Sequence, residues 1–176
     1  MACIFALYTI YRIFKNKNGQ ENYMNWIISK SRKLRYHTDL SELTKPFQPY
    51  LARYKWLFSD LDFITSRLSY LPINFDKDYF ILTAKDFQKI AEEDVQIIWG
   101  ALLAVPENQE INTSEQPPFV EGNDNIWKDG NIQLENAEIE IDCFDSSYTI
   151  VKFKSMEMSK AFKDYFPEAI ELEKFT

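Results

Sequence analysis

Residues 96–105 read QIIWGALLAV, a run in which every residue except Gln96 and Gly100 is apolar. Pro106 follows directly and interrupts further pairing. A short, nearly continuous apolar run bounded by a proline is typical of a strand that is buried on both faces of a sheet. We therefore expect a central strand over residues 96–105, with the flanking elements packed around it.

The segment before this run carries the signals of a strand followed by a helix. In residues 78–82, Asp78 is followed by four aromatic or aliphatic residues, a composition that predicts a short strand. Thr83 is a suitable N-cap for a helix over residues 84–93. The spacing of Phe87, Ile90 and Ala91 places these side chains on the inward face of that helix.

The segment after residue 130 predicts a hairpin and a last helix. Residues 131–144 alternate, and residues 148–153 return after a short turn, so we expect an antiparallel hairpin over 132–153. Ser155 then caps a helix over 156–165. The alternation separates an apolar face from an acidic face, formed by Ile139, Ile141 and Cys143 and by Glu138, Glu140 and Asp142.

The N-terminal half is interpreted as one strand and two helices. Residues 3–14 are rich in β-branched and aromatic side chains and suggest a strand, with a buried helix as the alternative. Residues 21–36 and 49–71 show helical apolar spacing. These elements together predict a single α+β domain over residues 1–176, with a mixed or antiparallel sheet and helices packed on one face.

The composition excludes several kinds of site. Four Gly, one His and two Cys are too few for glycine-rich phosphate loops, histidine triads or an unaided zinc cluster. We therefore expect no catalytic residue, no metal and no cofactor. The apolar opening run is shorter than the roughly 20 residues of a membrane span. With Cys3 and Cys143 interpreted as free thiols, the expected setting is the cytoplasm.

The charge is unevenly distributed along the chain. The net charge is −7, yet residues 1–60 carry 10 basic and 4 acidic side chains, a difference of +6. Residues 92–145 carry 14 acids and one base, Lys128, a difference of −13. Such a chain is repelled by nucleic acid and by anionic membranes, so neither is expected as a partner. The basic stretch 30–35 is interpreted as a solvated helix face, with nucleic-acid binding or pairing with the acidic half as alternatives.

Isolated titratable residues give weaker signals. His37 is two residues from Asp39, a spacing that would let a carboxylate orient an imidazole, but a structural role is favoured. The carboxylates at positions 60 and 62, and at 76 and 78, are each separated by one residue. In a strand each pair would share a face, as in a metal or glycosidase site, but for Asp76 and Asp78 exposed turn residues are the preferred interpretation.

The acidic block predicts a surface for a basic protein partner. Acids on a strand, beside a long loop that presents aromatic residues, can combine a binding hot spot with electrostatic steering. Packing of Trp127 beneath the loop, and a merely solubilising role for the acids, remain open alternatives. The expected partner-binding residues are Phe119, Glu121, Asp124, Trp127, Asp129, Glu138, Glu140, Asp142 and Asp145.

Residues 107–130 and 135–145, together with the strand and helix of residues 79–104, resemble bacterial immunity proteins. The resemblance implies a cytoplasmic, non-catalytic inhibitor that neutralises a cognate toxin, often a basic nuclease. The alternatives are an adaptor or scaffold module, or a carboxylate- or metal-dependent enzyme. The oligomeric state is left open.

Overall fold

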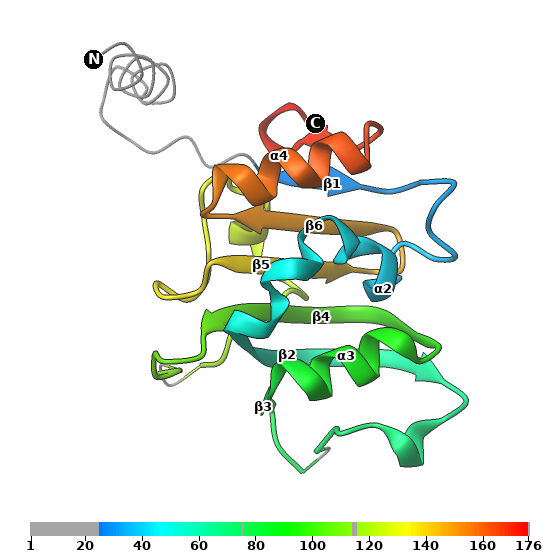
Figure 1. Cartoon of the computed structure of the whole chain (residues 1–176), viewed down its shortest axis with the longest axis vertical. Helices are drawn as coiled ribbons and strands as arrows, with labels where there is room; N and C mark the ends of the chain where they lie inside the picture. Colours follow the sequence, from blue (N-terminus) through cyan, green and yellow to red (C-terminus); the bar gives the residue numbers. More distant parts are fainter. Residues whose placement is uncertain (1–24, 75, 114–115, 176) are drawn as a thin grey trace.

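The computed structural model describes residues 25–74, 76–113 and 116–175. Within these ranges seven strands form one antiparallel sheet (Figure 1). The strands are β1 (Trp26–Ile28), β2 (Tyr54–Thr65), β3 (Tyr79–Leu82), β4 (Val95–Pro106), β5 (Ile139–Phe144), β6 (Tyr148–Phe153) and β7 (Ile170–Glu171). Their order across the sheet is β3-β2-β4-β5-β6-β1-β7. The predicted α+β class is confirmed, in its antiparallel form.

The apolar run at residues 96–105 lies in β4, which pairs with β2 on one side and β5 on the other. Gly100 lies opposite a β-bulge in β2, where the register shifts between Ser59 and Asp62. A Cβ atom at position 100 would lie 3.0 Å from Cδ1 of Leu61. Glycine therefore leaves room for the additional residues of the bulge.

Helical elements cover one face of the sheet (Figure 1). They are α2 (Leu40–Leu43), the 3₁₀ segment η1 (Lys45–Arg53), α3 (Ala84–Glu92) and α4 (Met156–Tyr165). Trp56 of β2 stacks on Phe87 of α3 with ring centroids 4.0 Å apart, and Phe153 of β6 packs on Phe162 of α4. This layer buries large aromatic side chains, whose apolar area is the main source of its stability.

The two predicted helix starts are confirmed by their capping geometry. Oγ1 of Thr83 accepts a hydrogen bond from the backbone N–H of Asp86 at 3.2 Å, at the start of α3. Oγ of Ser155 accepts one from Met158 at 3.3 Å, at the start of α4. Each bond satisfies an N–H group that has no partner within its own helix.

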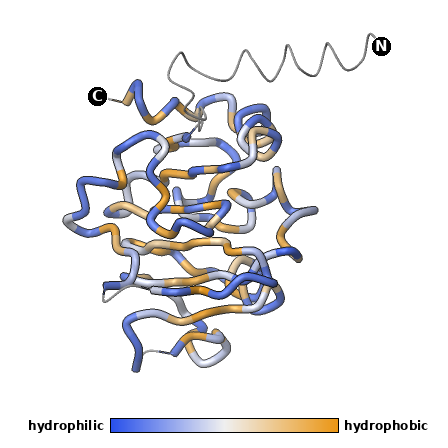
Figure 2. Tube along the Cα trace, turned by 90° about the vertical axis from the view of Figure 1, so that its left-hand side faces the viewer, coloured by the Kyte–Doolittle hydropathy of each residue, from blue (hydrophilic) through white to orange (hydrophobic). Residues whose placement is uncertain are grey.

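The second face of the sheet is covered by the connection between β4 and β5. Apolar side chains of this connection, Val120, Ile126, Leu134 and Ala137, belong to the same buried cluster as Leu57, Leu103 and Ile150 of the strands. Figure 2 shows hydrophobic residues concentrated along the strands in the middle of the molecule. The sheet is therefore buried between helices on one side and an irregular segment on the other.

Two of the predicted helices are wrong. Residues 26–28 form β1, which pairs with β6 and β7, and the rest of the described part of 21–36 is irregular. Of the helix predicted over 49–71, residues 49–53 are helical as part of η1, but residues 54–65 form β2. Residues 56–58 of β2 are apolar and buried on both faces of the sheet, and together with the apolar residues around them they mimic helical spacing. The strand predicted over residues 3–14 lies outside the described residues.

The predicted hairpin is confirmed, but its first strand begins at Ile139 rather than near residue 131. Residues 131–138 belong instead to the segment that covers the second face of the sheet.

Candidate functional site

A pocket of about 590 Å³ opens beside the β2 bulge. It brings together parts of the chain that are far apart in the sequence: β2, the turn before β3, β4 and the loop at 116–121. Its acidic residues are Asp60, Asp62, Asp78 and Glu121, against one basic side chain, Lys77. Its aromatic walls are formed by Phe80, Trp99 and Phe119. We call this site the acidic pocket.

The β2 bulge holds the loop that forms one wall of the acidic pocket. Asp60 has a left-handed backbone, with φ of 51°, a conformation that Asp and Asn tolerate better than most residues. Its Oδ2 atom accepts hydrogen bonds from the backbone N–H groups of Val120 at 2.7 Å and Glu121 at 2.9 Å. The adjacent Ser59 hydroxyl donates to the carbonyl oxygen of Pro118 at 2.6 Å.

Phe119 is fixed through both of its backbone polar groups. Its N–H donates to Oε1 of Gln133 at 3.0 Å, and its carbonyl oxygen accepts from Nδ2 of Asn123 at 2.9 Å. The Asn123 amide also donates to Oε1 of Gln133 at 3.1 Å. The loop around Phe119 is therefore held in one conformation before any ligand arrives, which lowers the entropy cost of binding.

The structure brings only two of the nine expected partner-binding residues into this pocket, Phe119 and Glu121. Asp124 and Asp145 are exposed elsewhere, at the start of η3 (Asp124–Trp127) and in the turn between β5 and β6. Asp129 is also exposed, and its Oδ1 atom accepts a hydrogen bond from Nδ2 of Asn25 at 2.8 Å.

Trp127 packs against other aromatic rings beneath the loop. Its ring meets that of Phe144 edge to face at 4.9 Å between centroids and stacks on Phe175 at 6.1 Å. Phe144 in turn packs against Trp99, at 4.6 Å between centroids. Of the two interpretations of Trp127, packing is the one that these contacts support. The same row of rings extends to the wall of the acidic pocket through Trp99.

The three acids of the predicted acidic strand face contact other side chains of this chain and do not project freely into solvent. Glu138 is half-buried and accepts a hydrogen bond from the Tyr54 hydroxyl at 2.6 Å, while burial and this bond raise the pKa of Tyr54. Glu140 and Asp142 are fully buried. Nζ of Lys152 lies 2.6 Å from a carboxylate oxygen of Glu140 and 2.9 Å from one of Asp142.

The expectation that Glu140 and Asp142 form an accessible surface is therefore wrong. Strand alternation does place them on one face, but residues 116–138 cover that face. Lys152 stands directly opposite Glu140 in the β5–β6 pairing and supplies the counter-charge that a buried carboxylate requires.

Sequence reasoning did not join Asp62 and Asp78 to Phe119 and Glu121. The one-residue spacing of the acids at 60 and 62, and of those at 76 and 78, drew attention to both pairs. No local signal connects these pairs with residue 121, because the β2–β3 pairing brings Asp78 to the site and hydrogen bonds to Asp60 bring Glu121 there. Trp99 was predicted only as part of the central strand.

Within the described ranges, no three carboxylate, imidazole or thiol groups lie close enough to hold a metal ion. Asp39 forms a two-point ion pair with Arg35, through bonds of 2.8 and 3.1 Å, rather than orienting His37. No helix in the described part of the chain has the length and apolar character needed to cross a membrane. No protein-family model, curated protein or solved structure matches the chain.

Proposed function

We propose that this chain is a non-catalytic binding protein that captures a basic protein partner, as an immunity protein captures its toxin. The observation that supports the proposal is the acidic pocket, where three exposed acids, Asp62, Asp78 and Glu121, share one cavity with aromatic side chains. This arrangement suits a lysine or arginine side chain that projects from a partner.

Two attractive interactions would hold such a side chain. The carboxylates accept charge-assisted hydrogen bonds from an ammonium or guanidinium group. The half-buried rings of Trp99 and Phe119 offer π faces to the same cation, an interaction of about 0.5–2 kcal/mol depending on its desolvation. Because Asp60 and Gln133 already fix the loop, little ordering is needed on binding.

The charge of the whole chain would accelerate the encounter. The net charge of −7 attracts a basic partner over a distance set by the ionic strength. Association should therefore be fast at low salt and slower at high salt. To inhibit a toxin in this way, the bound chain needs only to cover the toxin's active site.

The test compares two triple variants with the same change in charge. The pocket variant is Asp62→Asn/Asp78→Asn/Glu121→Gln, which keeps Asp60 as the loop anchor. The control variant is Glu92→Gln/Glu107→Gln/Glu173→Gln, at exposed positions outside the pocket. Proteins captured by the wild-type chain from a lysate of the native cells are identified at low salt. For each captured protein that is basic, surface plasmon resonance then measures its affinity for the wild-type chain, the pocket variant and the control variant.

We expect a basic partner whose affinity falls at least about tenfold in the pocket variant and far less in the control. Addition of the chain should inhibit that partner's activity in proportion to the complex formed. Equal loss of affinity in both variants would reject the acidic pocket as the binding site. Capture of a partner that keeps its full activity would favour an adaptor.

A further inference from the structure

A chain of hydrogen bonds connects the buried charged residues of β5 and β6 to the wall of the acidic pocket, and it passes through Gln133. The backbone N–H of Gln133 donates to Oε2 of Glu140 at 2.6 Å, and its side-chain amide donates a longer bond, of 3.5 Å, to Oδ1 of Asp142. Oε1 of the same amide accepts the N–H of Phe119 at 3.0 Å and Nδ2 of Asn123 at 3.1 Å. Gln133 therefore contacts two buried acids and also fixes the loop of the acidic pocket.

The buried cluster holds two acids and one base, Glu140, Asp142 and Lys152, and all three side chains are completely buried. If both acids were ionised, the cluster would carry an excess negative charge, which is strongly destabilising away from water. The cluster is therefore most stable when it retains one proton. Both oxygens of Glu140 accept hydrogen bonds, one from Lys152 and one from Gln133. Asp142 is thus the acid that carries the proton.

The groups around Asp142 leave it as the titrating member of the cluster. Burial raises the pKa of Asp142, and the adjacent acid adds to this effect. Lys152 faces it from β6, and the two acids raise the pKa of this lysine overall despite its burial, so it stays charged. From β4, the residue directly opposite is Ala101, which does not titrate. Burial raises the pKa of the neighbouring Cys143 thiol well above 9.0, so the thiol stays neutral.

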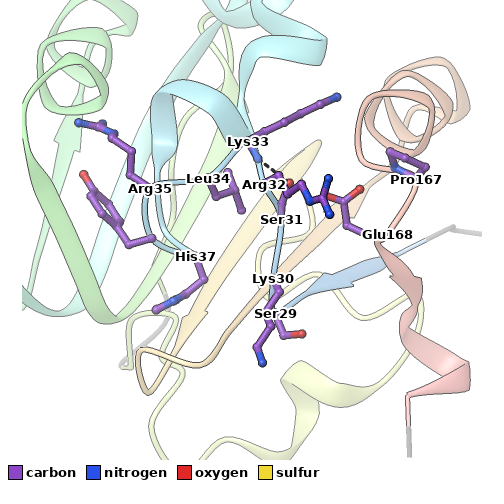
Figure 3. A pocket seen from close by; sticks show the side chains of 11 residues that line it. Ser29, Lys30, Ser31, Arg32, Lys33, Leu34, Arg35, His37, Pro167 and Glu168 are labelled. Carbon is purple, nitrogen blue, oxygen red and sulfur yellow. Dashed lines mark hydrogen bonds between the residues drawn. The ribbon is translucent and has the colours of Figure 1, made fainter.

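His37 also titrates near neutral pH, but it lies apart from this cluster. It lines a separate pocket beside β1, among residues 29–37 (Figure 3). Its backbone carbonyl accepts a hydrogen bond from the Thr149 hydroxyl at 2.6 Å. Thr149 pairs with Cys143, so strand alternation places it on the face of the sheet opposite to Asp142. Burial lowers the pKa of His37, so its titration makes stability rise with pH, the opposite sign to that of Asp142.

Loss of the proton favours opening of the segment that covers the acids. In the closed structure, ionised Asp142 adds a charge that water cannot reach. When Gln133 moves away, water solvates the carboxylate and its pKa returns toward about 4. Opening is therefore linked to release of one proton to solvent, and it becomes up to about tenfold more favourable for each pH unit, until the pH exceeds the pKa of the closed state. The same movement breaks the bonds from Gln133 to Phe119 and Asn123.

We propose that Gln133 is the positioning residue of the acidic pocket and couples its wall to the proton held by the buried acids. While the proton is held, the network is complete and Phe119 stays fixed. As the pH rises, the wall is released more often. The acidic pocket then binds a basic partner more weakly. This last step rests on the function proposed above, whereas the movement of the loop does not.

Amide hydrogen exchange without any ligand tests the coupling. The exchange rate of the Phe119 amide is measured from pH 5 to 8 and divided by its intrinsic rate at each pH. Urea denaturation at the same pH values gives the rate expected from complete unfolding. Asp142→Asn removes the titrating group and keeps its shape. Asp145→Asn makes the same change at an exposed position in the turn of the same hairpin and serves as the control.

We expect the Phe119 amide to exchange faster than complete unfolding allows. Its corrected rate should increase at least about fivefold between pH 5 and 8 in the wild-type chain and in Asp145→Asn. In Asp142→Asn the corrected rate should stay constant within about twofold. Exchange only by complete unfolding, or an unchanged pH dependence in Asp142→Asn, would overturn the proposal.

Gln133→Met tests the positioning role, because methionine has a similar length but no amide to donate and accept these bonds. The corrected rate of Phe119 should be at least about tenfold higher than in wild type at pH 5 and nearly independent of pH. The urea midpoint should still fall as the pH rises, since Asp142 is unchanged. Gln88→Met, at an exposed position of α3, should behave as wild type. Retained protection of Phe119 in Gln133→Met would reject the positioning role.

A binding measurement separates this coupling from the proposed function. The ligand is N-acetyl-arginine amide, which carries a guanidinium and no other charge, with the uncharged N-acetyl-citrulline amide as the blank. NMR shifts of Phe119 report binding at pH 6 and pH 8. We expect affinity for the arginine compound to be at least about threefold lower at pH 8, and unchanged with pH in Asp142→Asn. Absence of binding together with pH-dependent exchange would reject the cation site and support the coupling. Binding without pH-dependent exchange would reject the coupling alone.

Discussion

The ammonium group of Lys152 lies 2.6 Å from a carboxylate oxygen of Glu140, and both side chains are completely buried. The two residues face each other across β5 and β6, and Asp142 shares the same lysine. The other oxygen of Glu140 accepts a hydrogen bond from the backbone N–H of Gln133 at 2.6 Å. Since the Gln133 side chain holds the N–H of Phe119, this buried cluster is connected to the loop of the acidic pocket.

Replacement of Lys152 should strongly destabilise the fold. Lys152→Met leaves two buried acids without their counter-charge, and removing one partner of a buried ion pair typically costs about 3–5 kcal/mol. Urea denaturation measures this loss. Lys160→Met removes the cation of an exposed pair and should leave the midpoint nearly unchanged. Similar midpoints for the two variants would show that the buried pair contributes little.

Asp142 should make stability fall as the pH rises. Burial, together with the negative charge of Glu140, raises the pKa of Asp142 well above 3.8. The folded state therefore binds more protons than the unfolded state above about pH 4, so the free energy of unfolding decreases as pH increases through this range. Burial tends to lower the pKa of Lys152, but the two acids raise it overall, so the lysine stays charged.

Asp142→Asn should remove that pH dependence. Relative to wild type, the variant should gain stability as the pH increases from 4.5 toward 8, because the asparagine amide has no proton to lose. Urea denaturation across this pH range measures the difference between the two curves. Parallel curves would mean that Asp142 has the same proton affinity in the folded and unfolded chains.

Removal of the Asp60 carboxylate should release the loop of the acidic pocket. Asp60→Ala eliminates two hydrogen bonds to backbone N–H groups and places alanine at a positive φ, a combined loss of about 2 kcal/mol. Amide hydrogen exchange at Val120 and Glu121 should become at least about tenfold faster. Asp60→Asn keeps an acceptor oxygen, and asparagine tolerates the left-handed backbone. The amides of Val120 and Glu121 should therefore exchange more slowly in this variant than in the alanine variant.

Trp127 should contribute to stability rather than to partner binding. Trp127→Ala removes contacts with Phe144 and Phe175 and should cost about 2–3 kcal/mol, less than a fully buried tryptophan. Trp127→Phe keeps an aromatic ring in the row and should recover part of that loss. Denaturation midpoints give the stability, and affinity for a captured partner gives the second readout. A large loss of affinity in a stably folded Trp127→Phe variant would instead identify a binding contact.

The reliable sequence predictions were those that depend on local chemistry. Thr83 and Ser155 cap their helices as expected, because an N-cap needs only a side-chain oxygen within three residues of a free N–H. The run at 96–105 is a central strand because its apolar residues require burial on both faces. The helix predicted for 49–71 was wrong from residue 54 onward, because residues 56–58 are apolar on both faces of β2 and their spacing does not distinguish a strand from a helix.

The acidic residues illustrate the limit of local reasoning. By itself, the sequence determined that Glu140 and Asp142 share one face of a strand, since alternation follows from backbone geometry. Only the tertiary structure decided that this face is covered, and that exposed acids from distant segments gather instead in a pocket beside the β2 bulge. The physical reason is that solvent exposure depends on packing between segments far apart in the chain, whereas side-chain alternation depends only on neighbouring residues.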